Sequence, residues 1–195
     1  MARRLKIGVD VDGVLVDFVA AFKKEAAQVL GREIIGEQTT WNFEDSLEIS
    51  QSEASKVWDS IDATPDWFYL NAIAKPGVEH YLPWLTRAHD VYFITSRKQG
   101  AGLPVAYQTQ LCLYELGVEF PVVIANTDKG ETAAALELDA FVDDYIKNIE
   151  RVCKVSPKTR VYIMDATYNK DFEGPFTRVT CFEDFANKIE DLSNE

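Results

Sequence analysis

The sequence predicts an α/β protein: a mostly parallel sheet covered by helices on both faces, with a small helical insertion after the first strand. Short apolar, β-prone runs alternate with segments of helical periodicity along most of the 195 residues. The runs are continuously apolar, which is typical of strands in a parallel sheet that is buried on both faces. Between residues 32 and 75 the apolar residues become largely aromatic, and this change predicts the insertion. We therefore expect a core domain of residues 1–16 and 76–195 and a helical cap of residues 17–75.

Five strands are expected in the core. The first is short, with apolar residues at Leu5, Ile7, Val9 and Val11, and it leads into Gly13, a residue that permits a strained turn. The other four are apolar runs that follow in chain order, at residues 90–94, 120–125, 140–142 and 160–164.

Helices are expected between the strands, and several have a recognisable start or end. Gly31 ends the first helix, Ser50 and Glu53 form an N-terminal capping pair, and Gly117 ends the helix that follows the second strand. The expected helices cover residues 14–30, 50–61, 78–88, 104–116, 131–136, 146–152 and 182–192.

Composition excludes several classes of function. A net charge of −12 and a pI near 4.6 argue against an extended nucleic-acid surface or an anionic-membrane surface. The 3 cysteines lie far apart and outside CxxC spacing, which indicates a reducing compartment and no zinc site. No apolar run approaches the length of a membrane span, and no signal-peptide core precedes the first strand. We expect a cytoplasmic protein with no membrane partner.

Polar residues follow four of the expected strands. Asp10 and Asp12 end the first strand, Thr95 and Ser96 end the second, Lys129 follows the third, and Asp143 and Asp144 end the fourth. Taken singly, each has an ordinary explanation as a helix cap, a turn or a solvated charge. Because the carboxyl ends of parallel strands meet at one edge of the sheet, their joint occurrence predicts a common site. The spacing after Asp10 does not fit a calcium loop of the EF-hand type, and no glycine-rich nucleotide motif is present.

The residue types at this edge are those that transfer of a phosphoryl group requires. Asp10 can attack phosphorus and form an aspartyl-phosphate, and Asp12 can give a proton to the leaving oxygen and take one from water. Thr95 can hydrogen-bond the phosphoryl oxygens, and Lys129 can hold a positive charge against them. Asp143 and Asp144 complete an oxygen-rich group that suits Mg²⁺.

This arrangement resembles the haloacid dehalogenase-like (HAD) hydrolase superfamily. Its four motifs match Asp10-Val11-Asp12-Gly13, Thr95, Lys129 and Asp143-Asp144. The resemblance implies a Rossmann-like core, with Asp10 as the nucleophile and Asp12 as the general acid and base. It implies Mg²⁺ held by the Asp10 carboxylate, the Asp12 backbone carbonyl and the acidic pair, with Asp144 favoured as the direct ligand. The second aspartate, Asp12, is carried by the phosphatases of this superfamily and not by its dehalogenases.

The insertion lies where a small helical cap occurs in this superfamily, and such a cap reads the leaving group. Its aromatic residues predict stacking on a planar group such as a nucleobase, whereas packing within the cap explains them equally well. A closer resemblance, to the 5′(3′)-deoxyribonucleotidase family, implies a nucleoside pocket at Phe18, Trp41 and Trp58. Candidate pocket residues next to these are Trp67 and Phe68.

The sequence departs from that family at Arg97, which stands where the family usually has proline, and in a longer interval from Lys129 to Asp143. The expected phosphate-binding residues are Thr95, Ser96 and Lys129, together with Arg97 if it contacts the phosphate instead of only covering the loop.

The expected function is therefore a Mg²⁺-dependent nucleotidase that acts on (deoxy)nucleoside monophosphates, with a homodimer as an open expectation because relatives often dimerise. The alternatives are a phosphatase for another small phosphate such as a sugar phosphate, a phosphatase for polynucleotide ends, and a binding protein that has kept the fold without turnover.

Overall fold

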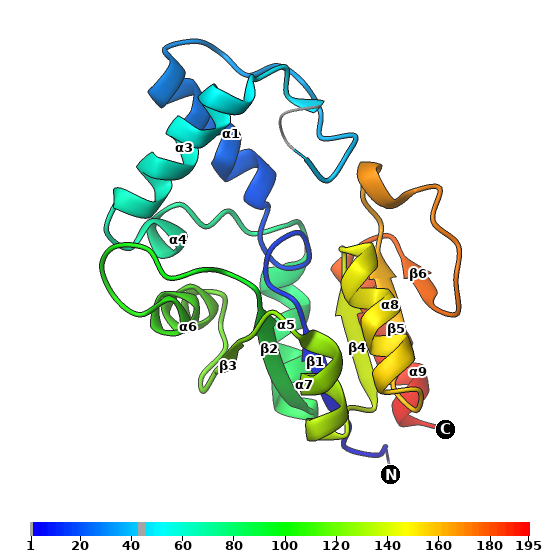
Figure 1. Ribbon diagram of the computed structural model, residues 1–195. Coiled ribbons are helices and arrows are strands. Elements are labelled where there is room, and N and C mark those ends of the chain that lie inside the picture. Colours follow the sequence, from blue (N-terminus) through cyan, green and yellow to red (C-terminus); the bar gives the residue numbers. More distant parts are fainter. Residues whose placement is uncertain (1, 43–45) are drawn as a thin grey trace.

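The computed structural model describes residues 2–42 and 46–195, so residues 43–45 of the expected cap lie outside the described residues. Within the described residues the sheet has six parallel strands in the order β3-β2-β1-β4-β5-β6 (Figure 1). The strands are β1 (Lys6–Val9), β2 (Asp90–Thr95), β3 (Val122–Ala125), β4 (Ala140–Asp143), β5 (Arg160–Met164) and β6 (Thr177–Val179). The five expected strands are confirmed, and the short edge strand β6 is an addition to them.

Helices cover both faces of the sheet, as the continuous apolar strands predicted. They are α1 (Phe18–Leu30), α3 (Gln51–Ala63), α4 (Trp67–Leu70), α5 (Val78–Ala88), α6 (Val105–Glu115), α7 (Lys129–Leu136), α8 (Ile146–Val155) and α9 (Phe182–Ser193), with a 3₁₀ turn η1 (Thr167–Asn169).

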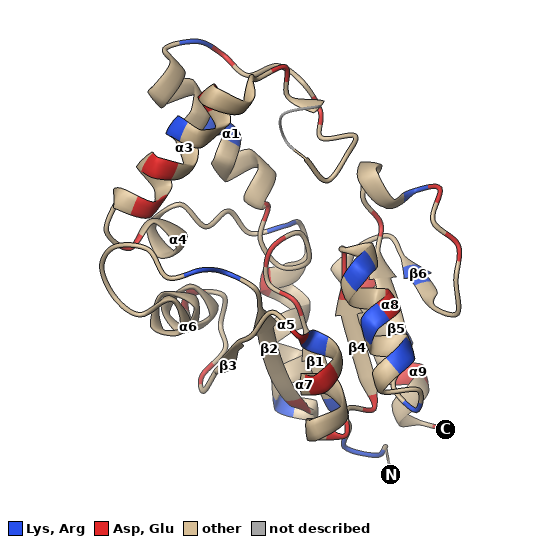
Figure 2. Ribbon diagram, viewed as in Figure 1, with Lys and Arg blue, Asp and Glu red and all other residues tan. Residues whose placement is uncertain are grey.

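Alternate residues along the strands point to opposite faces, and each face has its own apolar cluster. Ile7 and Val9 pack in one cluster with residues of α5, α6 and α9, whereas Phe141 and Ile163 pack in another with residues of α7 and α8. Gly8 faces the second cluster, where a Cβ atom would lie 2.6 Å from the Leu138 side chain. Because both faces of the sheet are covered by apolar clusters, the charged residues lie mainly on the outer helix surfaces and at strand ends, and the central strands carry few of them (Figure 2).

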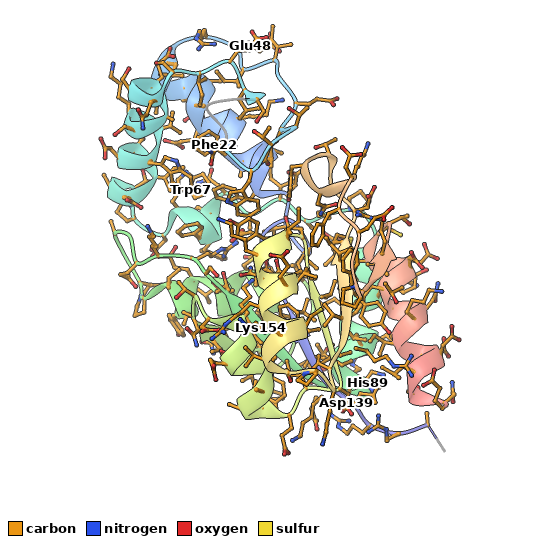
Figure 3. The ribbon with its side chains drawn as sticks, turned by 45° about the vertical axis from the view of Figure 1, so that its right-hand side comes forward. Phe22, Glu48, Trp67, His89, Asp139 and Lys154 are labelled. Carbon is orange, nitrogen blue, oxygen red and sulfur yellow. The ribbon has the colours of Figure 1, made fainter. Side chains whose placement is uncertain are left out.

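The inserted residues form most of a further hydrophobic cluster, which Val105 of α6 joins. Phe22 of α1, Val57 and Ile61 of α3, and Trp67 of α4 are buried together, and Phe22 and Trp67 are labelled in Figure 3. Helix α3 starts as predicted: the Ser50 hydroxyl and the Glu53 carboxylate form a capping box.

The insertion leaves the core and returns to it through two adjacent segments. Asp17 N donates to Ile73 O at 2.7 Å, and Lys75 N donates to Leu15 O at 2.9 Å. The first helix begins at Phe18 rather than at Val14, because Leu15 and the following valine donate to Val11 O in a tight turn. This pair of segments places the insertion above the carboxyl end of β1 (Figure 1). No helix among the described residues is long and apolar enough to cross a membrane.

Candidate active site

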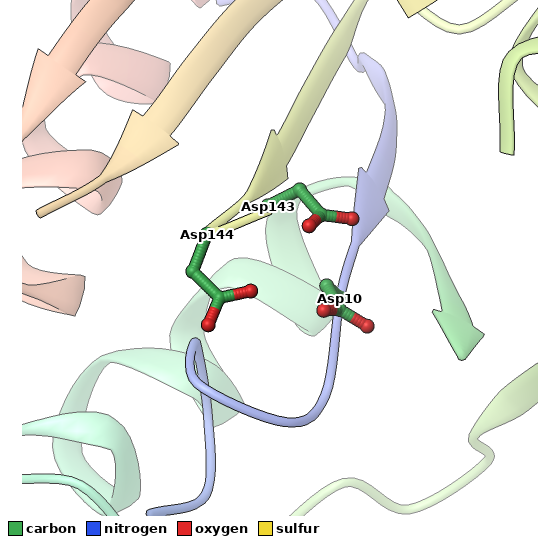
Figure 4. A group of neighbouring side chains, drawn as sticks. All are labelled: Asp10, Asp143 and Asp144. Carbon is green, nitrogen blue, oxygen red and sulfur yellow. The ribbon is translucent and has the colours of Figure 1, made fainter. Parts of the chain in front are cut away.

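Three buried carboxylates lie together where the strand order reverses. Asp10 follows β1, Asp143 ends β4, and Asp144 comes next (Figure 4). The two strands are neighbours, with Val9 opposite Val142, and Asp10 N donates to Val142 O at 3.0 Å. Oxygen atoms of the three carboxylates lie within 4.8 Å of one another. Such a reversal point, at the carboxyl ends of the strands, is the usual ligand site of open α/β sheets.

Lys129 is the cation of this group. It is the first residue of α7, whose N-terminus is capped by the Asp128 side chain, and its side chain is 1% exposed. Its Nζ atom lies 2.6 Å from Asp10 Oδ1 and 2.7 Å from Asp143 Oδ2. Burial opposes the charge, but the two carboxylates outweigh it and raise the pKa of Lys129 above its usual range. The lysine therefore stays protonated and links the nucleophile candidate to β4.

The two aspartates of the pair have different surroundings. Asp143 accepts hydrogen bonds from Lys129 Nζ, from Tyr145 N at 2.8 Å and from Asn148 Nδ2 at 3.1 and 3.2 Å, so the protein itself engages both of its oxygens. The Asp144 carboxylate accepts from the Tyr168 hydroxyl and lies directly against Gly13.

Gly13 is needed at this place for two reasons. Its φ is +78°, a backbone conformation that other residues rarely adopt, and a Cβ atom there would lie 1.7 Å from Asp144 Oδ2.

The three carboxylates repel one another. Burial and the charge of Asp143 raise the pKa of Asp10 well above its usual value, and the same two causes raise the pKa of Asp144 to about 7. Lys129 pairs with two of the three carboxylates and Lys75 adds a positive charge near Asp144, so the three ionised carboxylates still outnumber these two ammonium groups. Buried carboxylate oxygens that lie close together and whose negative charge is not fully neutralised by the protein suit a hard cation such as Mg²⁺. Asp10 and Asp144 would hold the ion, with Asp143 fixed behind them by its own hydrogen bonds.

Asp12 is held by Arg97. Arg97 Nε lies 2.8 Å from Asp12 Oδ2, and Nη2 lies 2.7 Å from Asp12 Oδ1, which is a bidentate ion pair. The Arg97 side chain is 3% exposed, its Nη1 donates to Thr109 Oγ1 at 3.2 Å, and its guanidinium lies 4.8 Å from the centre of the Phe68 ring. The structure therefore places the Arg97 guanidinium on the Asp12 carboxylate.

The two hydroxyl residues after β2 have different positions. Thr95 is fully buried, and its Oγ1 accepts from Arg97 N at 3.2 Å. Ser96 is exposed, with its Oγ 3.5 Å from Asn126 O. Their assignment to phosphate binding stays a prediction.

The five predicted aromatic pocket residues are not all in one place. A narrow cavity next to Asp12 and Arg97 is lined by Phe18, Trp67 and Phe68, together with polar residues that include Asp17 and Asn71.

Trp58 and Trp41 are not among the residues that line this cavity. Trp58 stacks on Phe18, with ring centres 5.8 Å apart. Trp41 stacks on Tyr145 at 3.7 Å and meets the edge of Tyr168 at 5.6 Å, so it lies near Asp144. The aromatic residues thus form two groups, one near Asp12 and one near Asp144.

A larger cavity, of about 330 Å³, lies at the other end of the sheet, between β2 and β3. Arg4, His89 and Phe120 are among its lining residues, and the strand-end acids are not. The smaller cavity is lined by Asp12 and Arg97 and so lies beside the strand-end acids, and we assign the candidate site to this edge of the sheet.

Sequence reasoning missed several residues that support the site. Asn169 is buried, and its Nδ2 donates to Asp144 O at 2.8 Å and to Met164 O at 2.9 Å. Lys75, at the return of the insertion, donates to Gly13 O at 2.5 Å. Tyr168 and Asn169 follow the end of β5, so the strand-end pattern that found the other residues applies to this strand as well.

Comparison with known proteins identifies the fold. No protein-family model and no curated protein sequence matches the chain. Among solved structures, a haloacid dehalogenase-like family hydrolase from Streptococcus pneumoniae is similar over 95% of this chain and 98% of its own, with a TM-score of 0.61 and 14% identity. A HAD-superfamily hydrolase of subfamily IA from Geobacter sulfurreducens is similar over 96% and 97%, with a TM-score of 0.61 and 13% identity.

A third structure, of a protein described as a HAD hydrolase from Bacillus subtilis, was solved with bound magnesium. It is similar over 96% of this chain and 99% of its own, with a TM-score of 0.59 and 14% identity. The protein therefore has the HAD-like α/β fold, as the motifs predicted. At these identities the likeness concerns the fold.

Proposed function

We propose that this protein is a Mg²⁺-dependent phosphomonoesterase that acts through an aspartyl-phosphate on Asp10. The observation that carries the proposal is the joint placement of Asp10, Lys129 and the acidic pair at the switch point of a HAD-like sheet, with Asp12 two residues after Asp10. These groups are the nucleophile, the cation and the metal ligands that phosphoryl transfer requires.

The first half of the reaction forms the intermediate. A carboxylate oxygen of Asp10 attacks phosphorus, the bond from phosphorus to the ester oxygen breaks, and that oxygen takes the electron pair and a proton from Asp12. Lys129 remains protonated between Asp10 and Asp143 and orients the attacking carboxylate. When bound, the divalent cation neutralises charge on the carboxylates and the phosphoryl oxygens, so that an anionic nucleophile can approach an anionic ester.

The second half restores the enzyme. Water attacks the phosphorus of the aspartyl-phosphate, Asp12 takes the proton of the water, and the bond from phosphorus to the Asp10 oxygen breaks. Asp10 returns as a carboxylate and inorganic phosphate leaves.

We propose a nucleoside monophosphate as the substrate. The support is the group of rings beside Asp12: Phe18, Trp67 and Phe68, with the polar Asp17 and Asn71, line a cavity of about 10 Å³, so a base binds between these rings only if the insertion moves outward from the core. Planar bases stack on such rings.

A sugar phosphate is the second candidate. The support for it is that neither Trp58, which stacks on Phe18 within the insertion, nor Trp41, which stacks on Tyr145 of the core, lines the cavity, as expected if these two aromatic residues are mainly structural.

Two assays test these proposals. Hydrolysis of 4-nitrophenyl phosphate with Mg²⁺ should stop with EDTA and in Asp10→Asn, and activity that survives both changes would refute the mechanism. A panel of nucleoside monophosphates and sugar phosphates then tests the substrate. Equal rates on both classes would refute recognition of the base, and poor competition by short oligonucleotides would exclude action on polynucleotide ends.

A further inference from the structure

Arg97 is held on three sides, and each contact comes from a different part of the fold. Asp12, after β1, takes two of its N–H groups, and Thr109 of α6 takes a third. Phe68 of α4, in the insertion, lies against the guanidinium plane at 4.8 Å. The backbone N–H of Arg97 also donates to Thr95 Oγ1. A side chain fixed in this way has one accessible geometry.

These contacts do not favour a direct role for Arg97 in binding phosphate. A bidentate contact with phosphate uses the same fork of N–H groups that Asp12 already occupies at 2.7 and 2.8 Å. The Arg97 side chain is also 3% exposed, whereas the Asp12 side chain is 27% exposed. The arginine lies behind the aspartate, and the aspartate carries the exposed surface.

The loop that carries Arg97 is fastened to the insertion. Ala101 N donates to Asp62 O at 2.8 Å, Asp66 N donates to Ala101 O at 3.2 Å, and Leu103 N donates to Asp66 Oδ1 at 2.7 Å. The position of Arg97 therefore depends on how the insertion lies on the core.

Phe68 provides a second connection of the same kind. Its ring packs against Trp67 at 5.5 Å and against Phe18 at 6.5 Å, inside the hydrophobic cluster of the insertion. The guanidinium that bonds Asp12 is thus also in contact with an insertion residue.

We propose that Arg97 is a positioning residue that orients the Asp12 carboxyl toward the leaving-group oxygen. Because Phe68 of the insertion contacts the Arg97 guanidinium, the orientation of Asp12 depends on how the insertion packs against the core. The inference rests on the proposed function, in which Asp12 carries the proton. This role explains why an arginine stands where the nucleotidase pattern has proline. It also means that the insertion, besides enclosing the substrate, helps to orient Asp12.

The test compares two esters that differ by one methylene group, 4-nitrophenyl phosphate and 4-nitrobenzyl phosphate. The nitrophenolate leaves without a proton, whereas the nitrobenzyl alkoxide needs one, so only the second ester depends on Asp12 as an acid. Arg97→Met should lower kcat/KM about 100-fold on the benzyl ester and less than about 10-fold on the phenyl ester, because kcat/KM reports only the steps up to departure of the leaving group and not the later hydrolysis that both esters share. Asp12→Asn should show the same imbalance, and Arg97→Lys should recover part of the loss.

The control is Arg160→Met, which removes an exposed ion pair with Glu195 and should leave both rates unchanged. Equal losses of kcat/KM on the two esters in Arg97→Met would overturn the proposal, because a merely structural role affects both. A rise in KM on both esters with kcat unchanged on both would also overturn it and would assign Arg97 to the phosphate.

A double-mutant cycle reads the same contacts without turnover, so that failure of the proposed function and failure of this inference can be told apart. Arg97→Met combined with Asp12→Asn, and Arg97→Met combined with Phe68→Leu, should each shift the urea midpoint by less than the sum of the single shifts. Additive shifts in both cycles would refute the linkage, whether or not the wild type hydrolyses either ester.

Discussion

The protonation of Asp144 connects the stability of the protein to metal binding and to pH. Burial and the charge of Asp143 raise the pKa of Asp144 to about 7 in the metal-free fold, whereas a free carboxyl titrates near 3.8. Between these two pH values the folded protein binds more protons than the unfolded chain, so the free energy of unfolding falls as the pH rises through this window. Mg²⁺ needs the ionised carboxylate, so its stabilising effect should grow over the same range.

The size of the effect follows from the two pKa values. A pKa of about 7 in place of 3.8 corresponds to a loss on the order of 4 kcal/mol in the free energy of unfolding once the pH is well above 7. The raised pKa of Asp10 acts in the same direction. Urea unfolding at pH 5, 6, 7 and 8, once with EDTA and once with Mg²⁺, measures the change.

Asp144→Asn is the matched control, because asparagine keeps the shape and cannot ionise. The variant should lose a large part of the pH dependence seen with EDTA, and it should lose the stabilisation by Mg²⁺. A metal-free wild type whose stability is unchanged or rises between pH 5 and 8, relative to this variant, would refute the reasoning about the buried carboxylates.

Three further substitutions give defined outcomes. Lys129→Met leaves Asp10 without its buried cation, so it should lower the free energy of unfolding by about 3–5 kcal/mol and abolish turnover. The control, Lys154→Met at an exposed position of α8, should change the free energy of unfolding by less than about 0.5 kcal/mol. A similarly small loss in Lys129→Met would contradict the ion pair between Lys129 and Asp10 as a source of stability. Gly13→Ala places a side chain at a positive φ and should lower the free energy of unfolding, measured with urea, by about 1–3 kcal/mol. The added Cβ should also displace the Asp144 carboxylate and weaken Mg²⁺ binding in calorimetry. Unchanged Mg²⁺ binding would argue against the close packing of Gly13 and Asp144. Tyr168→Phe removes a hydrogen bond that lowers the pKa of Asp144, so in the variant more of Asp144 is protonated at pH 7. Mg²⁺ affinity should therefore fall roughly 10-fold at pH 7 and change little at pH 9. An equal loss of affinity at both pH values would contradict protonation of Asp144 as the reason.

Local patterns were sufficient for the five longer strands of the sheet and for the acids of the site. The strand Ala140–Asp143 is an apolar run that ends in carboxylates, and parallel pairing alone brings its end next to Asp10. Edge strand β6 escaped prediction because it has 3 residues and one of them is Arg178, so it offers neither a long apolar run nor an alternation. Helix α1 starts later than its periodicity predicted, because Asp17 caps it and the preceding residues close a turn.

Contacts between distant segments were the part that could not be predicted. Arg97 and Asp12 are 85 residues apart, and nothing in the local sequence says that the arginine faces a carboxylate and not a phosphate. The family resemblance implied one nucleoside pocket for the aromatic residues, but the fold divides them, and Trp41 stacks on Tyr145 next to the acidic site. Side-chain type indicates what a residue can do, and the tertiary contacts decide where it does it.

The central claim is that a phosphoryl group is transferred to Asp10, and trapping that group tests it most directly. The protein is mixed with Mg²⁺ and 4-nitrophenyl phosphate, quenched in acid during turnover and treated with borohydride, which reduces an aspartyl-phosphate to homoserine. Peptide mass spectrometry should find homoserine at position 10 in the wild type and no trapped residue in Asp10→Asn. Turnover with no modification of Asp10, or with the phosphoryl group on another residue, would contradict the claim.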